Sequence, residues 1–391
     1  MNKKIVIVGG GFAGVQAAVR LANQIGFQVQ LISPLSIFEY HAALYRSATG
    51  RSPLEVAIPL EKFFEYAKNI EVVQDKIIKI DQDKKQIEGK FGKKYSYDEL
   101  LLGVGNVTGY FHIPGVEKYS FGVKSVEQAL KLKEHLHKNL SEKKYEHAYV
   151  VVGAGPTGVE LAAEMASYLK FVAKRHKVPT DKFTIYLVEA GPKVLGMLPK
   201  KFTDKIEKRI KALGIKLYLN TAVESETKEY VNLPGEKIKS RTVIWTAGVQ
   251  PNPLFAENDI KMTKRGRVEV NEYLQSSSHV YVMGDSAATK YTGMAQTAIH
   301  DAKFVATNLI RERNKKQPLK YRPKRPDYAI PVGARWAAVK KGKKNYFGFM
   351  GWILRRLTDL KLYRQFLPID KALTTWRYGY EKYEVCPECS R

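Results

Sequence analysis

Two glycine-rich turns in this chain have the spacing that cradles phosphate groups. Gly9, Gly11 and Gly14 fit the pattern G-x-G-x-x-G directly after an apolar run. The first glycine allows a tight turn, the second lets the backbone approach a pyrophosphate, and the third lets a helix pack on its strand. The same spacing recurs at Gly153, Gly155 and Gly158. Two such turns predict two dinucleotide sites, and glycine turns of an ordinary α/β fold are the less favoured interpretation.

The residue at the end of the second strand of each unit should contact a ribose. A carboxylate at this point binds the ribose hydroxyls and disfavours a 2′-phosphate. Glu189 holds the position in the second unit, within "IYLVEAG", which predicts NADH over NADPH. The first unit ends "VQLISP" and has Ser33 there. A hydroxyl can hydrogen-bond a ribose, but without the strength of a charge-assisted bond.

The sequence contains two cysteines, Cys386 and Cys389, in the motif "CPEC". Two cysteines provide no disulfide framework, and their scarcity favours a reducing compartment. Two thiolates are half of a structural zinc site, unless a second tail supplies the other two ligands. A solvated tail is the simpler interpretation, and we assign no metal ligand from the sequence.

The elements that must position these residues form a duplicated pattern. Each unit contains an apolar strand, a glycine turn, a helix and a second strand, beginning near Lys4 and Ala148. The strands are continuous Val, Ile and Leu runs, as in parallel strands buried on both faces. A helix is expected over about 293–313, followed by a joint rich in Pro and Lys from Lys315. The pattern predicts an α/β fold with two Rossmann-like dinucleotide-binding domains, one inserted in the other, and a basic C-terminal module.

The charge of the chain is strongly positive. With 65 Lys and Arg against 39 Asp and Glu, the net charge is +26 and the pI is about 9.7. Residues 303–391 hold 22 basic and 7 acidic residues, so 22 − 7 = +15 of that charge lies in the last stretch. Such an excess indicates attraction to polyanions or to acidic lipid headgroups. The sequence has no run of about 18 apolar residues free of charge, so a transmembrane helix is not expected and membrane contact would be peripheral.

The segment "GWILRRLTDLKLYRQFL", residues 351–367, combines large apolar residues with basic ones. An apolar stripe at helical spacing predicts an amphipathic helix. The stripe consists of Phe349, Met350, Ile353, Leu354, Leu357 and Leu360. The helix either covers a core or lies on a flat, negatively charged apolar surface. In the second case Arg355 and Arg356 should meet lipid headgroups.

Several motifs resemble those of type II NADH:quinone oxidoreductases, which are flavoproteins with two dinucleotide-binding domains. The matching runs are "GGGFAG", "GAGPTGVELAAE", "WTAGV", "VYVMGD" and "AQTAIH". The resemblance covers essentially the whole chain and implies FAD in the first unit and NADH in the second. The FAD site that it implies consists of Gly9, Gly11, Gly14, Ser33, Gly105, Gly284, Asp285, Ala295 and Gln296. The NADH site that it implies consists of Gly153, Gly155, Gly158, Glu189, Ala247 and Gly248.

The same resemblance implies three catalytic residues. "AQTAIH" is similar to the family's quinone motif Ala-Gln-x-Ala-x-Gln, with His300 in place of the last Gln. Gln296 and His300 lie four apart on a helix and can each hydrogen-bond a quinone carbonyl. The alternative is that both bond to neighbouring backbone. Glu160 matches a glutamate between the nicotinamide, flavin and quinone sites, where it would relay a proton or position a ligand.

The resemblance therefore predicts an FAD-dependent NADH:quinone oxidoreductase that pumps no protons. It is expected as a homodimer, bound peripherally at the cytoplasmic face of the cell membrane through its C-terminal segment. The expected domains are 1–115 with 250–335 for FAD, 116–249 for NADH and 336–391 for the membrane. The alternatives are a sulfide:quinone-oxidoreductase-like enzyme, an NADH-linked flavoprotein with a soluble acceptor, and an NADH-responsive flavoprotein that binds nucleic acid. The aliphatic residues of the C-terminal segment fit an acyl boundary better than nucleic acid, so no nucleic-acid partner is expected.

Overall fold

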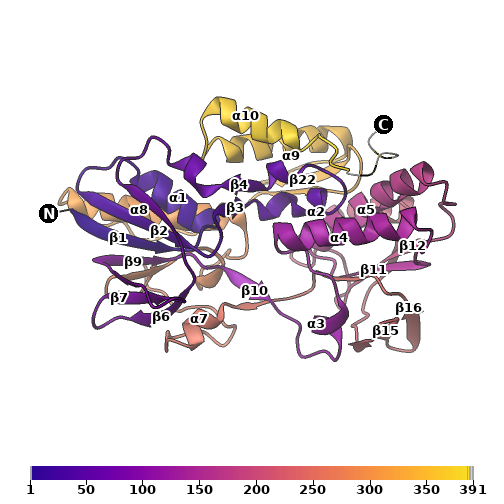
Figure 1. Ribbon diagram of the computed structural model, residues 1–391, viewed down its shortest axis with the longest axis horizontal. Helices are drawn as coiled ribbons and strands as arrows, with labels where there is room; N and C mark the ends of the chain where they lie inside the picture. The colour runs from indigo at the N-terminus through magenta and orange to yellow at the C-terminus, as the bar shows by residue number, and fades with distance from the viewer. Residues whose placement is uncertain (1, 385, 387–388, 390–391) are drawn as a thin grey trace.

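The first glycine turn lies in a six-stranded sheet at one end of the molecule (Figure 1). The structure is a computed structural model that describes residues 2–384, 386 and 389. The strand order is β19-β20-β9-β1-β2-β5, and every pair is parallel except β19 with β20. Helix α1 packs between this sheet and α8. The elements are β1 (Lys3–Val8), α1 (Phe12–Leu21), β2 (Phe27–Ser33), β5 (Ile70–Gln74), β9 (Glu99–Leu102), β19 (Gln275–Ser277), β20 (Val280–Val282) and α8 (Ala295–Arg313).

The second glycine turn lies in a separate parallel sheet of four strands, ordered β13-β12-β11-β17. Strand β11 is buried along its whole length, as its continuous apolar sequence predicts. Helices α4 and α5 pack together above this sheet (Figure 1). The elements are α4 (Val126–Ser141), β11 (Ala148–Val152), α5 (Pro156–Arg175), β12 (Thr184–Val188), α6 (Lys200–Ala212), β13 (Lys216–Tyr218) and β17 (Val243–Trp245).

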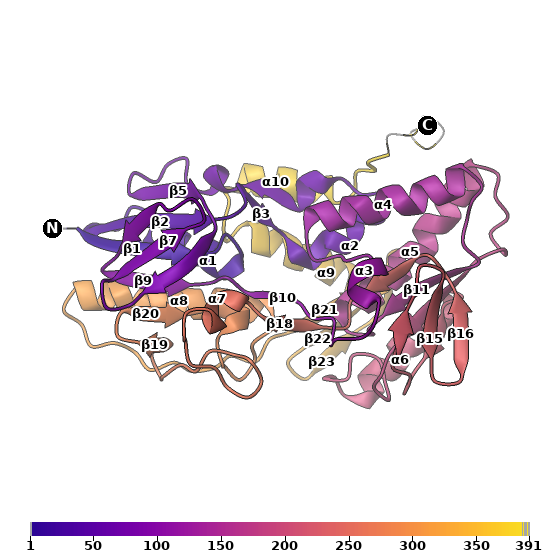
Figure 2. The same cartoon turned by 60° about the horizontal axis from the view of Figure 1, so that its bottom comes forward.

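The chain crosses between the two sheets twice, and the two crossings pair with each other. Strand β10 (Asn106–Thr108) leads away from the first sheet, and β18 (Val249–Pro251) returns to it. They form an antiparallel pair in the middle of the molecule (Figure 2). The α/β fold with two parallel dinucleotide-type sheets is thus as predicted.

Small antiparallel sheets and short helices complete the two halves. One such sheet is β6-β7-β8 and another is β14-β15-β16. The remaining elements are β3 (Ile37–Glu39), α2 (Leu44–Ser47), β4 (Ala57–Pro59), β6 (Ile77–Asp81), β7 (Gln86–Gly89), β8 (Lys94–Ser96), α3 (Val116–Tyr119), β14 (Ser225–Glu226), β15 (Tyr230–Leu233), β16 (Glu236–Lys239), α7 (Pro253–Ala256), and the short 3₁₀ helices η1 (His41–Ala43), η2 (Pro53–Glu55), η3 (Leu60–Phe63) and η4 (Gly284–Ser286).

The C-terminal region lies across the junction of the two halves (Figure 1). A three-stranded antiparallel sheet precedes two helices, and α9 packs on β22 and α10. Within the described residues, no helix is both long and apolar enough to cross a membrane. The elements are β21 (Tyr328–Pro331), β22 (Ala337–Lys341), β23 (Lys344–Tyr346), α9 (Gly348–Tyr363) and α10 (Ile369–Tyr378).

Helix α9 turns its charged residues inward and part of its apolar stripe outward. Arg355 and Arg356 are 5% and 4% exposed, so the expectation that they meet lipid headgroups is wrong. They are held inside because buried carboxylates pair with them, Asp359 on the same helix and Glu55 on η2. Phe349, Met350 and Leu357 are instead 57%, 56% and 52% exposed. The helix is therefore anchored by ion pairs and leaves large apolar side chains on the surface.

Candidate functional site

One cavity of about 850 Å³ reaches from the first glycine turn to the second and to helix α9. Its volume is in the range of cofactor and ligand sites. The first half contributes Gly9 to Ala13 and residues 283–285, the second half contributes Pro156, Thr157 and Glu160, and the C-terminal region contributes residues 328–330, Arg355, Thr358 and Leu362. The cavity therefore joins the first turn to the start of α5, next to the second turn, and to the C-terminal region.

The first turn has the three glycine functions that its spacing predicts. Gly9 has φ +114°, and a side chain there would overlap the carbonyl of Gly103. A Cβ on Gly14 would overlap the Gly9 carbonyl, so α1 can pack only because residue 14 is glycine. A Cβ on Gly11 would meet no protein atom within 4 Å. The space above Gly11, at the N-terminus of α1, is a cradle that the protein leaves open to a phosphate.

The second turn repeats this geometry. Gly153 has φ +98°, and its Cβ would overlap Ala247, while a Cβ on Gly158 would overlap the Gly153 carbonyl. A Cβ on Gly155, at the N-terminus of α5, would again meet no protein atom within 4 Å. Gly248 lines the cavity and is packed too closely against Gly109 and the Phe111 ring to accept a side chain. The two cradles therefore have the same shape, as an internal duplication implies.

The strand ends place Ser33 and Glu189 in corresponding positions. Val8 pairs with Ile32 and Val152 pairs with Val188, so the next residue of each second strand lies beside the first glycine of its turn. The Glu189 carboxylate accepts hydrogen bonds from the Ala154 N–H at 2.7 Å and the Gly191 N–H at 2.8 Å. Ser33 lines the cavity, and its Oγ accepts from the Leu35 N–H at 3.3 Å.

A second polar turn enters the cavity from β20. Gly284 has φ +72°, and its N–H donates to buried Asp301 at 3.0 Å. Burial raises the pKa of Asp285, which lines the cavity, and the cations Lys124 and Arg267 oppose this rise. Asp301 therefore holds this turn through its hydrogen bond to the Gly284 N–H, although no sequence motif assigned it a function. Gly105 and Ala295, both predicted for the FAD site, also line the cavity.

Glu160 lines the cavity from the first turns of α5, between the two cradles. Burial raises the pKa of its carboxyl to about 8, against the opposing charges of Arg355 and Arg46. The group therefore carries a proton at neutral pH and can donate it to a bound molecule. Glu160 has the position and protonation state that a proton-transfer residue requires.

Of the other two residues predicted to be catalytic, Gln296 lines the cavity and His300 does not. Gln296 lines the cavity, but its amide pairs with the backbone of Asp327, through Nε2 to O at 2.9 Å and from N to Oε1 at 3.2 Å. His300 is not part of the lining, and its Nε2 lies 2.9 Å from the Arg322 carbonyl. The alternative of bonding to neighbouring backbone thus describes both side chains, and we do not carry His300 further as a quinone ligand.

Helix α9 contributes to the cavity although the sequence suggested only a core or membrane helix. Arg355, Thr358 and Leu362 are among the residues that line it. Their spacing of three and four is a helical face, a signal that the apolar stripe on the other face obscured. The interpretation of the cysteine segment as a solvated tail is also wrong for Cys389, which is 2% exposed.

A buried ion cluster holds α9 in this position. Arg46 donates to Glu55 at 2.6 Å and to Asp359 at 2.8 Å, and Arg356 donates to Glu55 at 3.0 Å. Arg355 pairs with Asp359 one helical turn away. Burial alone would raise the pKa of Asp359, but the three guanidinium groups hold it well below its usual range. Removing one carboxylate would leave buried positive charge without compensation.

Asp359→Ala should lower the free energy of unfolding by about 3–5 kcal/mol, the usual cost of breaking a buried ion pair. Urea unfolding at neutral pH measures the change. Asp370→Ala, at an exposed position in the first turn of α10, serves as the control and should change stability by only about 0.5 kcal/mol. Equal stability of the two variants would show that the cluster does not hold the helix.

Comparisons with known proteins agree with this geometry. The profile of the pyridine nucleotide-disulphide oxidoreductase family matches residues 3–302. The type II NADH:quinone oxidoreductase Ndh of Mycobacterium tuberculosis is 26% identical over 407 positions, covering 95% of this chain and 87% of that protein. A type II NADH:quinone oxidoreductase of Staphylococcus aureus is 28% identical over 337 positions, covering 80% of this chain and 83% of that protein.

Two solved structures share the fold at low identity. The structure of NDH2 from Plasmodium falciparum in complex with NADH superposes with a TM-score of 0.87 at 18% identity, covering 97% of this chain and 98% of that one. The sulfide:quinone oxidoreductase of Aquifex aeolicus has a TM-score of 0.77 at 20% identity, covering 99% and 98%. Both likenesses extend through the C-terminal region of the fold.

Proposed function

The chain belongs to the pyridine nucleotide-disulphide oxidoreductase family, and we propose that it is a type II NADH:quinone oxidoreductase, using FAD to oxidise NADH and reduce a membrane quinone without pumping protons. Its relatives of that name align along most of the chain. The observation that carries the proposal is one cavity lined by the first glycine turn, by Pro156, Thr157 and Glu160 beside the second turn, and by the C-terminal helix. We further propose that 1–115 with 250–335 binds FAD, that 116–249 binds NADH, and that 336–391 contacts the membrane.

The residues of the first unit fit FAD. The open space above Gly11 suits its pyrophosphate, at a helix N-terminus that favours negative charge. Asp285, on the turn after β20, can accept hydrogen bonds from the hydroxyls of the ribityl chain. The end of β2 has no carboxylate, so the Ser33 hydroxyl is the group there that can contact the ribose. When bound, FAD supplies the chemistry of taking a hydride from NADH and passing two electrons to a quinone.

The residues of the second unit fit NADH. Gly155 leaves the matching cradle open, and α5 begins at this point. Glu189 already holds the turn through Ala154 and presents its carboxylate at the strand end, where a 2′-phosphate would be repelled.

Glu189→Gln tests this preference because glutamine keeps an oxygen that can accept from Ala154 but removes the charge. The wild type should prefer NADH over NADPH by roughly 100-fold or more in kcat/KM, and the variant should narrow the gap about tenfold. Steady-state kinetics with both nucleotides measure the ratio, with Glu236→Gln, an exposed acid of the same half, as control. Equal kcat/KM for the two nucleotides in the wild type would contradict the assignment.

The acceptor end of the cavity lies between Glu160 and the face of α9 formed by Arg355, Thr358 and Leu362. An apolar quinone ring fits beside Leu362, and the polar groups can orient its carbonyls. The protonated Glu160 carboxyl can deliver one of the two protons that a quinone takes up on reduction.

Quinone reduction should therefore lose rate as Glu160 loses its proton. Because the pKa is about 8, the acid form predominates below pH 8 and falls about tenfold per pH unit above it. The kcat/KM for a quinone should follow this decline in the wild type and show none in a slower Glu160→Gln variant. Flavin reduction by NADH, followed by rapid mixing, should stay nearly flat over the same range. Exposed Glu127→Gln is the control, and a wild-type profile retained in Glu160→Gln would remove the residue from proton transfer.

We propose that the enzyme binds peripherally at the cytoplasmic face of the membrane as a homodimer. Membrane binding is supported by the exposed apolar side chains of α9 and by the lysines that precede them at Lys341, Lys343 and Lys344. Binding at a surface gives a lipid-soluble quinone direct access to the cavity wall formed by α9.

The other functions considered for this sequence receive less support. Sulfide oxidation needs thiols that can reach the flavin. Both cysteines of the sequence lie instead beside His137 and His176, and neither is among the residues lining the cavity.

An acceptor screen tests the proposed function. The purified full-length protein should contain about one FAD per chain. It should oxidise NADH with a soluble quinone and with ferricyanide, and it should show no sulfide-dependent quinone reduction. Failure to reduce any quinone, with ferricyanide activity intact, would favour a soluble natural acceptor.

A further inference from the structure

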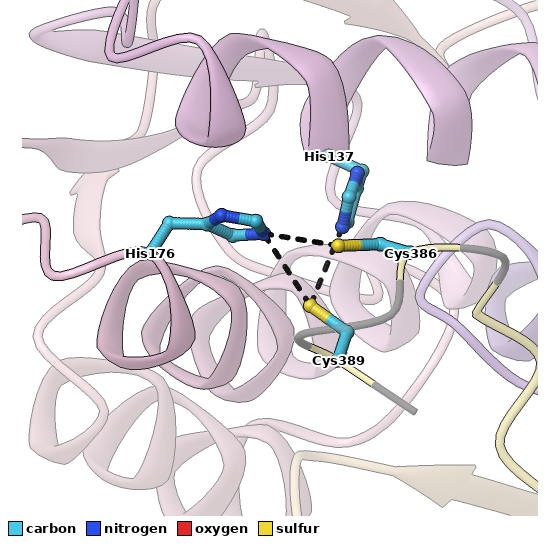
Figure 3. Close-up of side chains that lie close together, drawn as sticks. All are labelled: His137, His176, Cys386 and Cys389. Carbon is cyan, nitrogen blue, oxygen red and sulfur yellow. Dashed lines mark hydrogen bonds between the residues drawn. The ribbon is translucent and has the colours of Figure 1, made fainter. Parts of the chain in front are cut away.

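Four side chains of types that bind metals converge outside the cavity lining, near the end of the described chain. His137 lies on α4, His176 caps the C-terminus of α5, and Cys386 and Cys389 come from the last residues (Figure 3). Their ligand atoms all lie within 4.8 Å of one another. Cys389 is buried and the other three are half-buried, so the group is enclosed by the protein.

Three sulfur–nitrogen distances among these atoms match those of a tetrahedral metal centre. Cys386 Sγ lies 3.6 Å and Cys389 Sγ 3.5 Å from His176 Nε2, and His137 Nε2 lies 3.4 Å from Cys389 Sγ. For zinc bonds of about 2.3 Å to sulfur and about 2.05 Å to nitrogen, the tetrahedral angle puts sulfur and nitrogen about 3.6 Å apart. Zinc binding would bring all four ligand atoms, which lie within 4.8 Å of one another, to separations of about 3.4–3.8 Å.

We propose that His137, His176, Cys386 and Cys389 bind one Zn²⁺ ion as a structural site. Two thiolates and two imidazoles in a tetrahedron are a donor set typical of zinc, and four protein ligands leave no open position for catalysis. Binding releases the thiol protons to solvent as the sulfurs coordinate. The "CPEC" motif supplies one half of the site, and the other half comes from two helices rather than from a second tail.

The site links the end of the chain to the NADH half of the molecule. The segment before it contacts both halves, because Lys133 Nζ on α4 donates to the Tyr383 carbonyl at 2.7 Å and the Tyr383 N–H donates to the Gly50 carbonyl at 3.0 Å. Metal bonds to Cys386 and Cys389 would attach the segment that follows α9 and α10 to the two histidines. Zinc therefore fixes the C-terminal region, which forms one wall of the cavity, against α4 and α5.

Metal analysis of the full-length protein, purified without chelator, tests the site. Inductively coupled plasma mass spectrometry should find about one zinc per chain. Cys386→Ser and His137→Ala should each lower the zinc content to about a tenth of that value or less. His137→Cys should retain it, because a third thiolate also completes a zinc site. His112→Asn, at an exposed loop position, is the control and should keep full zinc.

Cobalt provides a second readout that does not depend on enzyme activity. Replacement of zinc by Co²⁺ should give the visible absorption of tetrahedral cobalt with thiolate ligands, and Cys389→Ser should abolish it. FAD content should stay unchanged in all variants, which separates this test from the proposed function. Wild-type protein that neither contains zinc nor binds added Zn²⁺ or Co²⁺ would overturn the proposal. Stoichiometric iron, a Cys386–Cys389 disulfide, or zinc retained in Cys386→Ser and His137→Ala would do the same.

Discussion

Gly11→Val should give a colourless protein, whereas Gly155→Val should give a yellow one that NADH no longer reduces. Both glycines have extended backbone angles, φ −87° and φ −70°, that valine adopts readily. Neither Cβ would touch the protein, so folding should be preserved in both variants. The added side chain would instead occupy the space of a pyrophosphate and block its hydrogen bonds to the helix N-terminus. Losing two charge-assisted bonds of this kind weakens binding by roughly 100-fold or more.

The two variants serve as controls for each other. FAD content from the visible spectrum and NADH affinity from flavin reduction by rapid mixing give the two readouts. Thermal unfolding of the Gly155→Val protein, compared with the wild type, checks that the substitution leaves the fold intact. Loss of FAD from the Gly155→Val protein would contradict the assignment of NADH to the second unit. A Gly11→Val protein that keeps one FAD per chain would contradict the assignment of FAD to the first unit.

The phosphate cradles could be predicted because their geometry depends on neighbours in sequence. A buried strand, a turn that requires positive φ at its first glycine and a helix that requires contact at its third are encoded within about ten residues. The register of the two parallel strands then fixed the position of Glu189, one residue beyond the last buried pair. Local patterns of this kind survive even where a single residue, such as Ser33, departs from them.

The zinc ligands could not be paired from the sequence, because three separate segments supply them. His137 and His176 lie on two helices that only tertiary packing brings side by side. The cysteines lie about 200 residues further along the chain. A histidine in a helix carries no signal of its partner, so "CPEC" on its own looked like half of a site.

The exposure of Arg355 and Arg356 on α9 was wrongly predicted for a similar reason. Arginine usually lies at a surface, and burial of two of them is stable only when carboxylates are buried with them. Those partners are Asp359 on the same helix and Glu55 on η2, about 300 residues earlier. The sequence does not show that Glu55 and Arg46 join this cluster. The adjacent pair Arg355 and Arg356 therefore favours an exposed basic face of the helix. The exposed lysines of the β22–β23 segment, Lys341, Lys343 and Lys344, are available to a charged surface.

Membrane binding should therefore depend on the outward apolar residues of α9, and not on its arginines. Replacing Phe349, Met350 and Leu357 together by Gln removes three exposed side chains that make no contribution to the buried ion cluster. If each contributes about 1 kcal/mol by entering the acyl boundary, binding to liposomes should fall roughly 100-fold. Flotation with vesicles of acidic and neutral lipids measures this, and reduction of long-tailed quinones should fall while NADH-to-ferricyanide activity persists.

The control is a protein in which Ile25 and Phe91, which are more exposed than the α9 residues but lie in the first half of the molecule, are changed to Gln. It should float with liposomes as the wild type does. Replacing Lys341, Lys343 and Lys344 by Gln should weaken binding to acidic vesicles by about 1 kcal/mol for each charge, and high salt should have the same effect. These substitutions are more specific than a truncation near Lys344, because truncation also removes Asp359, one of the two carboxylates that pair with Arg46. If the triple α9 variant floats as well as the wild type, the exposed apolar face contacts another protein surface, and the quinone reaches the cavity by a route that does not depend on this helix.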